Sequence, residues 1–247
     1  MNVRIIISAL GLLLLIEGFF LLLSGLVAVY FGGPDIQALL MSSGFAAATG
    51  GLMFFLNRKA PRQMGKREGY IIVGTAWVVF SLFGMLPFML SGAIPNATDA
   101  FFETISGFTT TGASVLNDIE ALPHGLLFWR SLTQWLGGMG IIVLSLAILP
   151  LLGIGGMSLF GAEVPGITPD KIHPRVRQTA KQLWGIYVIF TVAEGLLLYM
   201  YGMDWFDAVN HAFTTMATGG YSTKQASVAA FSPQIQYIIT LFMFLAG

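Results

Sequence analysis

The chain contains no cysteine, so it holds neither disulfide bonds nor thiolate metal sites. Charge is also scarce: Asp, Glu, Lys and Arg make up 10% of the 247 residues, whereas a soluble domain carries about 25%. The 12 basic and 12 acidic residues cancel, which excludes a polybasic surface for nucleic acid. His124, His173 and His211 show no ligand spacing, so we expect surface or helix-capping roles and no transition metal. No nucleophile–base pair or phosphate-binding loop is recognisable, so we expect neither an enzyme nor a cofactor.

Apolar sequence is what the chain has in abundance. Hydrophobic residues make up 55% and the mean hydropathy is +0.78. Runs near the 20 or so residues that a spanning helix needs cover 5–30, 36–56, 69–91, 126–152 and 183–201. The first run is too long for a signal-peptide core, so it is interpreted as a retained span. We therefore predict an all-α integral membrane protein. A last apolar run starts near Phe231 and reaches Gly247, and we expect the chain to be the N-terminal part of a longer protein.

Lysine and arginine are distributed asymmetrically between the loops. Ten of the twelve basic residues are Arg4 or lie in 58–67 or 171–181. Basic loops favour the cytoplasmic side, so we predict a multi-pass membrane protein with a cytoplasmic N-terminus. This alternation requires that 97–114 and 205–222 enter from the outer face and return without crossing.

Those two segments are copies of one another. "DAFFETISGFTTTGAS" runs from Asp99 to Ser114, and "DAVNHAFTTMATGGYS" runs from Asp207 to Ser222, an ungapped offset of 108 residues (207 minus 99). Each is an apolar segment followed by a Thr/Gly turn. This is the pattern of a potassium-selectivity filter, in which a half-helix precedes extended backbone whose carbonyls replace the ion's water shell. Asn96 or Thr98 is expected to cap the first half-helix.

The sequence leaves two roles open for each of several polar residues. Glu103, one turn after Asp99, either concentrates cations at the outer mouth or hydrogen-bonds the back of the filter. Glu17 and Glu194, inside apolar helices, are either packing residues or functional carboxylates. Gln134, with the small residues that follow it, either packs a helix against the half-helix or lines a cavity.

The Thr/Gly segments, together with "QWLGGMGIIVLSLAILPLLGIGGMSLF", "AEVPG" and "ATGGYST", resemble the Trk/Ktr/HKT superfamily of potassium transporters, and within it the bacterial Trk membrane subunits. The resemblance implies two leading helices and four helix–filter–helix repeats around one pore. It also implies a homodimer in the lipid of the bacterial inner (cytoplasmic) membrane and a cytoplasmic nucleotide-binding regulatory subunit. The implied ion-coordinating positions are Thr110, Thr111, Gly112, Ala113, Thr218, Gly219, Gly220 and Tyr221.

The expected organisation is two leading helices (1–66), a first repeat (67–157), a cytoplasmic linker (158–182) and a second repeat that ends within its last helix (183–247). Repeats three and four are missing from this sequence. Potassium uptake through backbone carbonyls is the function that these observations favour, with Asp99, Glu103, Asp207 and Glu194 as possible mouth or coupling residues. The alternatives are a K⁺ symporter coupled to H⁺ or Na⁺, and a non-conducting half-pore or scaffold.

Overall fold

A computed structural model describes residues 2–58, 66–152 and 172–247. Regular structure within these ranges is helical, as the composition predicts. The elements are α1 (Val3–Phe31), α2 (Ile36–Asn57), α3 (Lys66–Gly84), α4 (Leu86–Leu90), α5 (Ala97–Phe108), α6 (His124–Leu152), α8 (Ile172–Met200), α9 (Trp205–Met216), the 3₁₀ helix η2 (Ser227–Ala230) and α10 (Pro233–Ala246). Thus α8 begins inside the segment expected to be a linker.

Among the described residues, four stretches are long and apolar enough to cross a bilayer: Val3–Phe31, Ile36–Asn57, Arg67–Leu90 and Gln178–Met200. The third stretch was predicted as one continuous helix, but it breaks between α3 and α4. Pro87 has no N–H to continue the hydrogen-bond ladder. Gly84, at the break, lies against Thr104 and Phe108, so α5 fits directly beside it.

The two leading helices pack through glycine. A Cβ on Gly11 would lie 2.7 Å from Phe54 N, and a Cβ on Gly50 would lie 2.7 Å from Gly11 O. Only glycine lets the two backbones approach this closely, as is common between membrane helices. The main core cluster lies beyond this contact, around Trp129, and joins α1 to α6.

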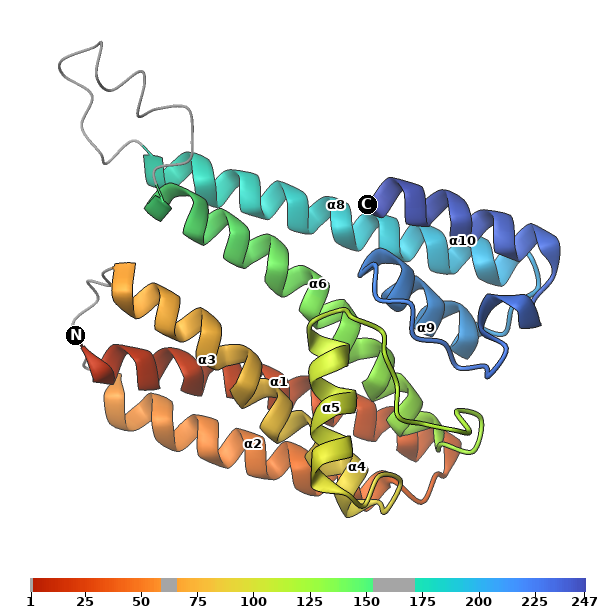
Figure 1. Ribbon diagram of the computed structural model, residues 1–247, viewed down its shortest axis with the longest axis horizontal. Coiled ribbons are helices and arrows are strands. Elements are labelled where there is room, and N and C mark those ends of the chain that lie inside the picture. Colours follow the sequence, from red (N-terminus) through yellow and green to blue (C-terminus); the bar gives the residue numbers. More distant parts are fainter. Residues whose placement is uncertain (1, 59–65, 153–171) are drawn as a thin grey trace, which may run out of the picture.

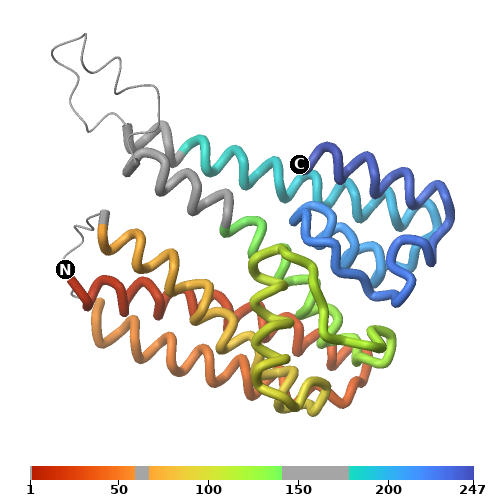
Figure 2. The backbone as a smooth tube through the Cα atoms, in the orientation of Figure 1, coloured from red at the N-terminus to blue at the C-terminus, as the bar shows by residue number. Residues whose placement is uncertain are grey.

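Figure 1 shows α1, α3 and α8 running from left to right, with α2 and α6 running the opposite way. Figure 2 shows two groups, with α1 to α5 in one and α8 to α10 in the other, and α6 passing between them. Helix α6 contacts members of both groups, including α1, α5, α8 and α9. The segment joining α4 to α6 therefore begins and ends at the same end of the bundle, and so does the segment joining α8 to α10.

Each of these joining segments contains a short helix, which we call re-entrant because its segment begins and ends at the same end of the bundle. Both α5 and α9 have 12 residues, or about 18 Å at 1.5 Å per residue, which is too short for a hydrocarbon core of about 30 Å. Of the two residues predicted to cap α5, Asn96 does so, accepting from Thr98 N at 2.8 Å. Asp204 caps α9 in the same way, accepting from Phe206 N at 2.9 Å. After each helix the chain returns in non-helical conformation, in 109–114 (return segment 1) and 217–222 (return segment 2).

Candidate ion-coordination site

The two return segments have matching backbone conformations. The φ angle is 55° at Thr110 and 54° at Thr218, and it is 75° at Gly112 and 78° at Gly220. Glycine enters this left-handed region freely. A β-branched threonine rarely does, and such strain costs about 1–3 kcal/mol. A strained threonine at the same place in both copies marks these segments as candidates for function.

The amide hydrogens of return segment 1 point back at the end of α5. Thr110 N donates to Gly107 O and Thr111 N donates to Ser106 O, each at 2.9 Å. The same two bonds recur at 2.9 Å in return segment 2, from Thr218 to Thr215 and from Gly219 to Thr214. N–H and C=O point in opposite directions across a trans peptide. The carbonyls before these amides, those of residues 109, 110, 217 and 218, therefore face away from the re-entrant helices.

Two of the predicted coordinating residues differ from the others. The carbonyl of Ala113 accepts from Ser106 Oγ at 2.7 Å and lies 3.1 Å from Tyr221 Oη, so this carbonyl already has protein partners although the residue is exposed. Tyr221 is 3% exposed and its ring lies against the first unit rather than outside it. Of the eight predicted positions, the exposed ones are Thr111, Ala113, Thr218 and Gly220.

The two return segments touch each other. A Cβ on Gly112 would overlap the carbonyl oxygen of Gly219, and a Cβ on Gly219 would overlap the side-chain amide of Gln134. Gln134 is fully buried, and its Oε1 accepts from Tyr221 N at 3.0 Å. Gln134 therefore supports return segment 2 from behind.

The glycines after Gln134 pack α6 against both re-entrant units. A Cβ on Gly137 would overlap Phe108 O at the end of α5, and a Cβ on Gly138 would lie 3.0 Å from the Cα of Ala217 at the end of α9. Of the two roles that the sequence leaves open for these residues, helix packing and cavity lining, the structure shows helix packing.

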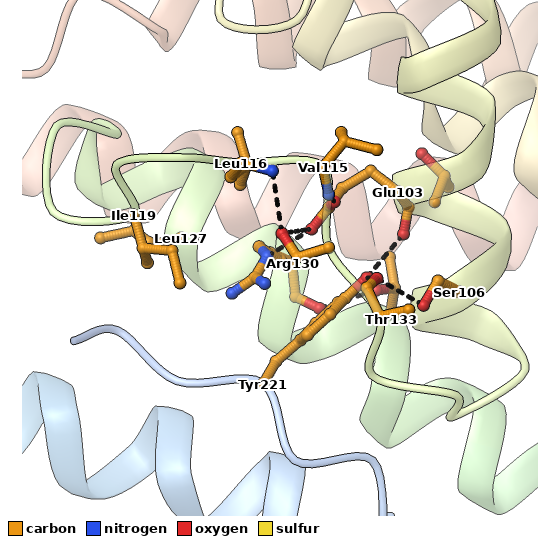
Figure 3. Close-up of polar contacts among 12 residues, drawn as sticks. Glu103, Ser106, Val115, Leu116, Ile119, Leu127, Arg130, Thr133 and Tyr221 are labelled. Carbon is orange, nitrogen blue, oxygen red and sulfur yellow. Dashed lines mark hydrogen bonds and ion pairs between the residues drawn. The ribbon is translucent and has the colours of Figure 1, made fainter. Parts of the chain in front are cut away.

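Glu103 lies behind return segment 1, 1% exposed, rather than at an outer mouth. Its Oε2 accepts from Val115 N at 2.9 Å, and its Oε1 accepts from Ser114 Oγ at 3.1 Å. Arg130 of α6 completes the group, with Nε 2.6 Å from Glu103 Oε1 (Figure 3). Sequence reasoning missed Arg130, which stood out only as a basic residue away from the basic loops.

His211 is the counterpart of Glu103 in the second unit, at the offset of 108 (211 minus 103). Its Nε2 lies 3.0 Å from Ser222 Oγ, which matches the bond between Ser114 and Glu103. Its Nδ1 lies 2.8 Å from Asp207 O. His211 is 2% exposed, so the prediction of a surface position is wrong for this residue. His124 is exposed, as predicted, and stacks on Phe31; the side chain of His173 lies outside the described residues.

The remaining acidic candidates are in different surroundings. Asp99 is exposed in the first turn of α5. Asp207 is mostly buried, and its carboxylate accepts from Thr223 Oγ1 at 2.6 Å and lies 3.5 Å from Lys224 Nζ. Glu17 and Glu194 are buried, at 2% and 0% exposed, and in the described part of the chain their carboxyl oxygens make no hydrogen bond of ordinary geometry.

Helices of membrane-spanning length, together with two short helices whose return segments are partly exposed, define an integral membrane protein. Comparison with known proteins gives the family. Residues 36–247 match the family described as TrkH, cation transport protein, and the chain belongs to that family.

The similar proteins are potassium transporters. The Trk system potassium uptake protein TrkH of Escherichia coli K12 is 46% identical over 251 residues, covering 100% of this chain and 52% of that protein. TrkG of the same organism is 34% identical, covering 97% of this chain and 49% of that protein. The crystal structure of the potassium transporter TrkH from Vibrio parahaemolyticus matches with a TM-score of 0.85 and 38% identity, over 99% of this chain and 50% of that one. This chain therefore spans about half the length of these relatives, and their names agree with the prediction that it is not an enzyme.

Proposed function

We propose that this chain contributes to potassium uptake across the bacterial inner membrane, with carbonyl oxygens of the two return segments as ligands for the ion. The observation that carries the proposal is the backbone conformation shared by the two segments, which aims successive carbonyls away from the re-entrant helices. A bare K⁺ ion enters such a site because the carbonyls replace its water shell.

The re-entrant helices add a favourable field. The C-terminal end of a helix carries about half a negative charge, and α5 and α9 both end directly at a return segment. Inward movement of one K⁺ is then driven by the membrane potential, which supplies about 2.3 kcal/mol per 100 mV. Basic loops favour the cytoplasmic side of a membrane. The proposed protein therefore has a cytoplasmic N-terminus, and an ion reaches the return segments from outside.

The assembly is also part of the proposal. This chain supplies two return segments, and its relatives are about twice as long. We place four such segments around one pore in the complete protein. We further propose that it works as a homodimer with a cytoplasmic nucleotide-binding regulatory subunit, as the family resemblance implies.

The proposal is tested by growth of potassium-uptake-deficient bacteria at low K⁺. The full-length protein should restore growth, and Gly112→Ser should abolish the K⁺ preference because the new side chain meets the carbonyl of Gly219. Gly44→Ser is the matched control, since a Cβ at Gly44 has nothing within 4 Å. A Gly112→Ser protein that restores growth and keeps its K⁺ preference contradicts the assignment of the site.

A second candidate function is K⁺ symport coupled to H⁺ or Na⁺. It is favoured by Glu194, a fully buried carboxyl on α8 that lies beside Thr215 at the end of α9. This version predicts that uptake depends on a pH or Na⁺ gradient and that Glu194→Gln removes the dependence. A non-conducting scaffold predicts no K⁺ flux when the full-length protein is reconstituted in liposomes.

A further inference from the structure

One guanidinium joins the two re-entrant units. Arg130 lies on α6, between the units, and is 3% exposed. Its Nε lies 2.6 Å from Glu103 Oε1 in the first unit, and its Nη1 donates to Ser222 O at 3.0 Å in the second. The planar fork of arginine reaches two acceptors in different directions, which a lysine ammonium on a flexible stem does not reproduce.

Tyr221 makes the complementary connection from the second unit to the first. Its hydroxyl, which has one proton to donate, lies 2.8 Å from Glu103 O and 3.1 Å from Ala113 O, both in the first unit. Its ring lies under the guanidinium of Arg130, 3.6 Å from ring centroid to Cζ, where a cation–π contact is favourable. Figure 3 shows the ring of Tyr221 extending from return segment 2 to Glu103 and Ser106 of the first unit.

These contacts, and not the local chain, hold the two units together at this point. The bond from Arg130 to Ser222 joins residues 92 apart in sequence, and the bond from Tyr221 to Glu103 joins residues 118 apart. Each re-entrant helix can form its own turn without them. The spacing between the return segments depends instead on contacts between the units, which include this group of Glu103, Arg130 and Tyr221, here called the inter-unit clamp.

The charges of the clamp are balanced. A buried guanidinium alone behind a cation pathway would repel the ion, and a buried carboxylate alone would carry a large desolvation cost. In the Glu103–Arg130 pair each charge has its partner and further hydrogen bonds, through Val115 N and Ser222 O. Charge-assisted hydrogen bonds are shorter and stronger than neutral ones, so the pair is suited to fix a position.

We infer that Arg130, paired with Glu103, is a positioning residue that sets the spacing of the two return segments and thereby the preference for K⁺ over Na⁺. Filter selectivity depends on where the carbonyls lie and how many surround the ion. A small change of spacing should therefore lower the ratio of K⁺ to Na⁺ flux before it lowers the total flux. The inference rests on the proposed potassium function, to which it adds the group that determines specificity.

The test measures K⁺ and Na⁺ fluxes separately in liposomes that contain the full-length protein. Arg130→Lys keeps the charge beside Glu103 and loses the bond to Ser222 O, so the ratio of K⁺ to Na⁺ flux should fall; a fall of about tenfold corresponds to the free energy of roughly one hydrogen bond. Tyr221→Phe keeps the ring under Arg130 and removes the hydroxyl that bonds to the first unit, and should lower the ratio in the same direction. The matched controls are Lys181→Arg and Tyr237→Phe, both at exposed positions, and they should leave the ratio unchanged.

A charge exchange separates positioning from simple ion pairing. In the double variant Glu103→Arg and Arg130→Glu, the opposite charges remain, but Val115 N faces a donor and Ser222 O faces an acceptor. We expect the ratio to stay low. Recovery of the original ratio overturns the inference, as does an unchanged ratio in both Arg130→Lys and Tyr221→Phe, whether the fluxes are normal or uniformly reduced. Absence of selective K⁺ flux from the unmodified protein instead refutes the proposed function.

Discussion

The contact between the two return segments can be tested by comparing alanine substitutions at two glycines that have the same backbone conformation. Gly112 and Gly220 have φ angles of 75° and 78°, and alanine in this region costs roughly 1–2 kcal/mol. A Cβ on Gly220 meets nothing within 4 Å, so Gly220→Ala should cost only that amount. A Cβ on Gly112 overlaps Gly219 O, and overpacking against backbone adds roughly 1–3 kcal/mol. We therefore expect Gly112→Ala to lose about 2–5 kcal/mol in total.

The assay is thermal unfolding of the purified protein in detergent, followed by tryptophan fluorescence. Gly44→Ala is the control of opposite sign: Gly44 lies inside α2 with open space beside it, and alanine there should stabilise the helix by up to about 1 kcal/mol. Equal destabilisation by Gly112→Ala and Gly220→Ala would refute the reasoning, because it would mean that the return segments do not meet at Gly112.

Three further predictions concern the supports of the site. Asn96→Ala should lower stability by about 1 kcal/mol through loss of the α5 cap, measured by the same unfolding assay, and an unchanged midpoint would contradict this. Trp129→Phe leaves Gly84 O without its donor at 2.9 Å and should cost about 1–3 kcal/mol, whereas a neutral result would mean that water replaces the indole. His211→Ala and Ser114→Ala should both slow K⁺ flux in liposomes, because each frees one end of a return segment, and an effect of only one of them would break the equivalence of the units.

The sequence was informative where structure is determined locally. Long apolar runs became helices, and the repeat at an offset of 108 became two re-entrant units with the same backbone angles, because turn geometry depends on adjacent residues. The Asn96 cap follows from the same local chemistry. The break at Pro87 was missed because the apolar run continues through it and proline is itself compatible with the first turn of a helix.

The supports behind the return segments were beyond the reach of a single sequence. Arg130 and Glu103 are 27 residues apart and on different helices, and no period or spacing connects them. The sequence does not decide whether Glu103 lies at the outer mouth or behind the filter, because its position on the helix does not say what packs against it. The buried position of His211 could have been predicted from the sequence. The repeat aligns His211 with Glu103, and equivalent positions in a duplicated unit are expected to share a role.

The equivalent serines of the two units, Ser114 and Ser222, have different side-chain partners, and the difference explains why Arg130 forms its ion pair in the first unit. In the first unit Ser114 donates to a carboxylate, which brings a negative charge into the protein and requires Arg130 to balance it. In the second unit Ser222 Oγ meets an imidazole, whose neutral form satisfies both contacts by donating from Nδ1 to Asp207 O and accepting at Nε2. Neither arrangement leaves an unbalanced charge behind the return segments. The carbonyl dipoles and the C-terminal ends of α5 and α9 therefore dominate the local field, which is the field that favours a cation.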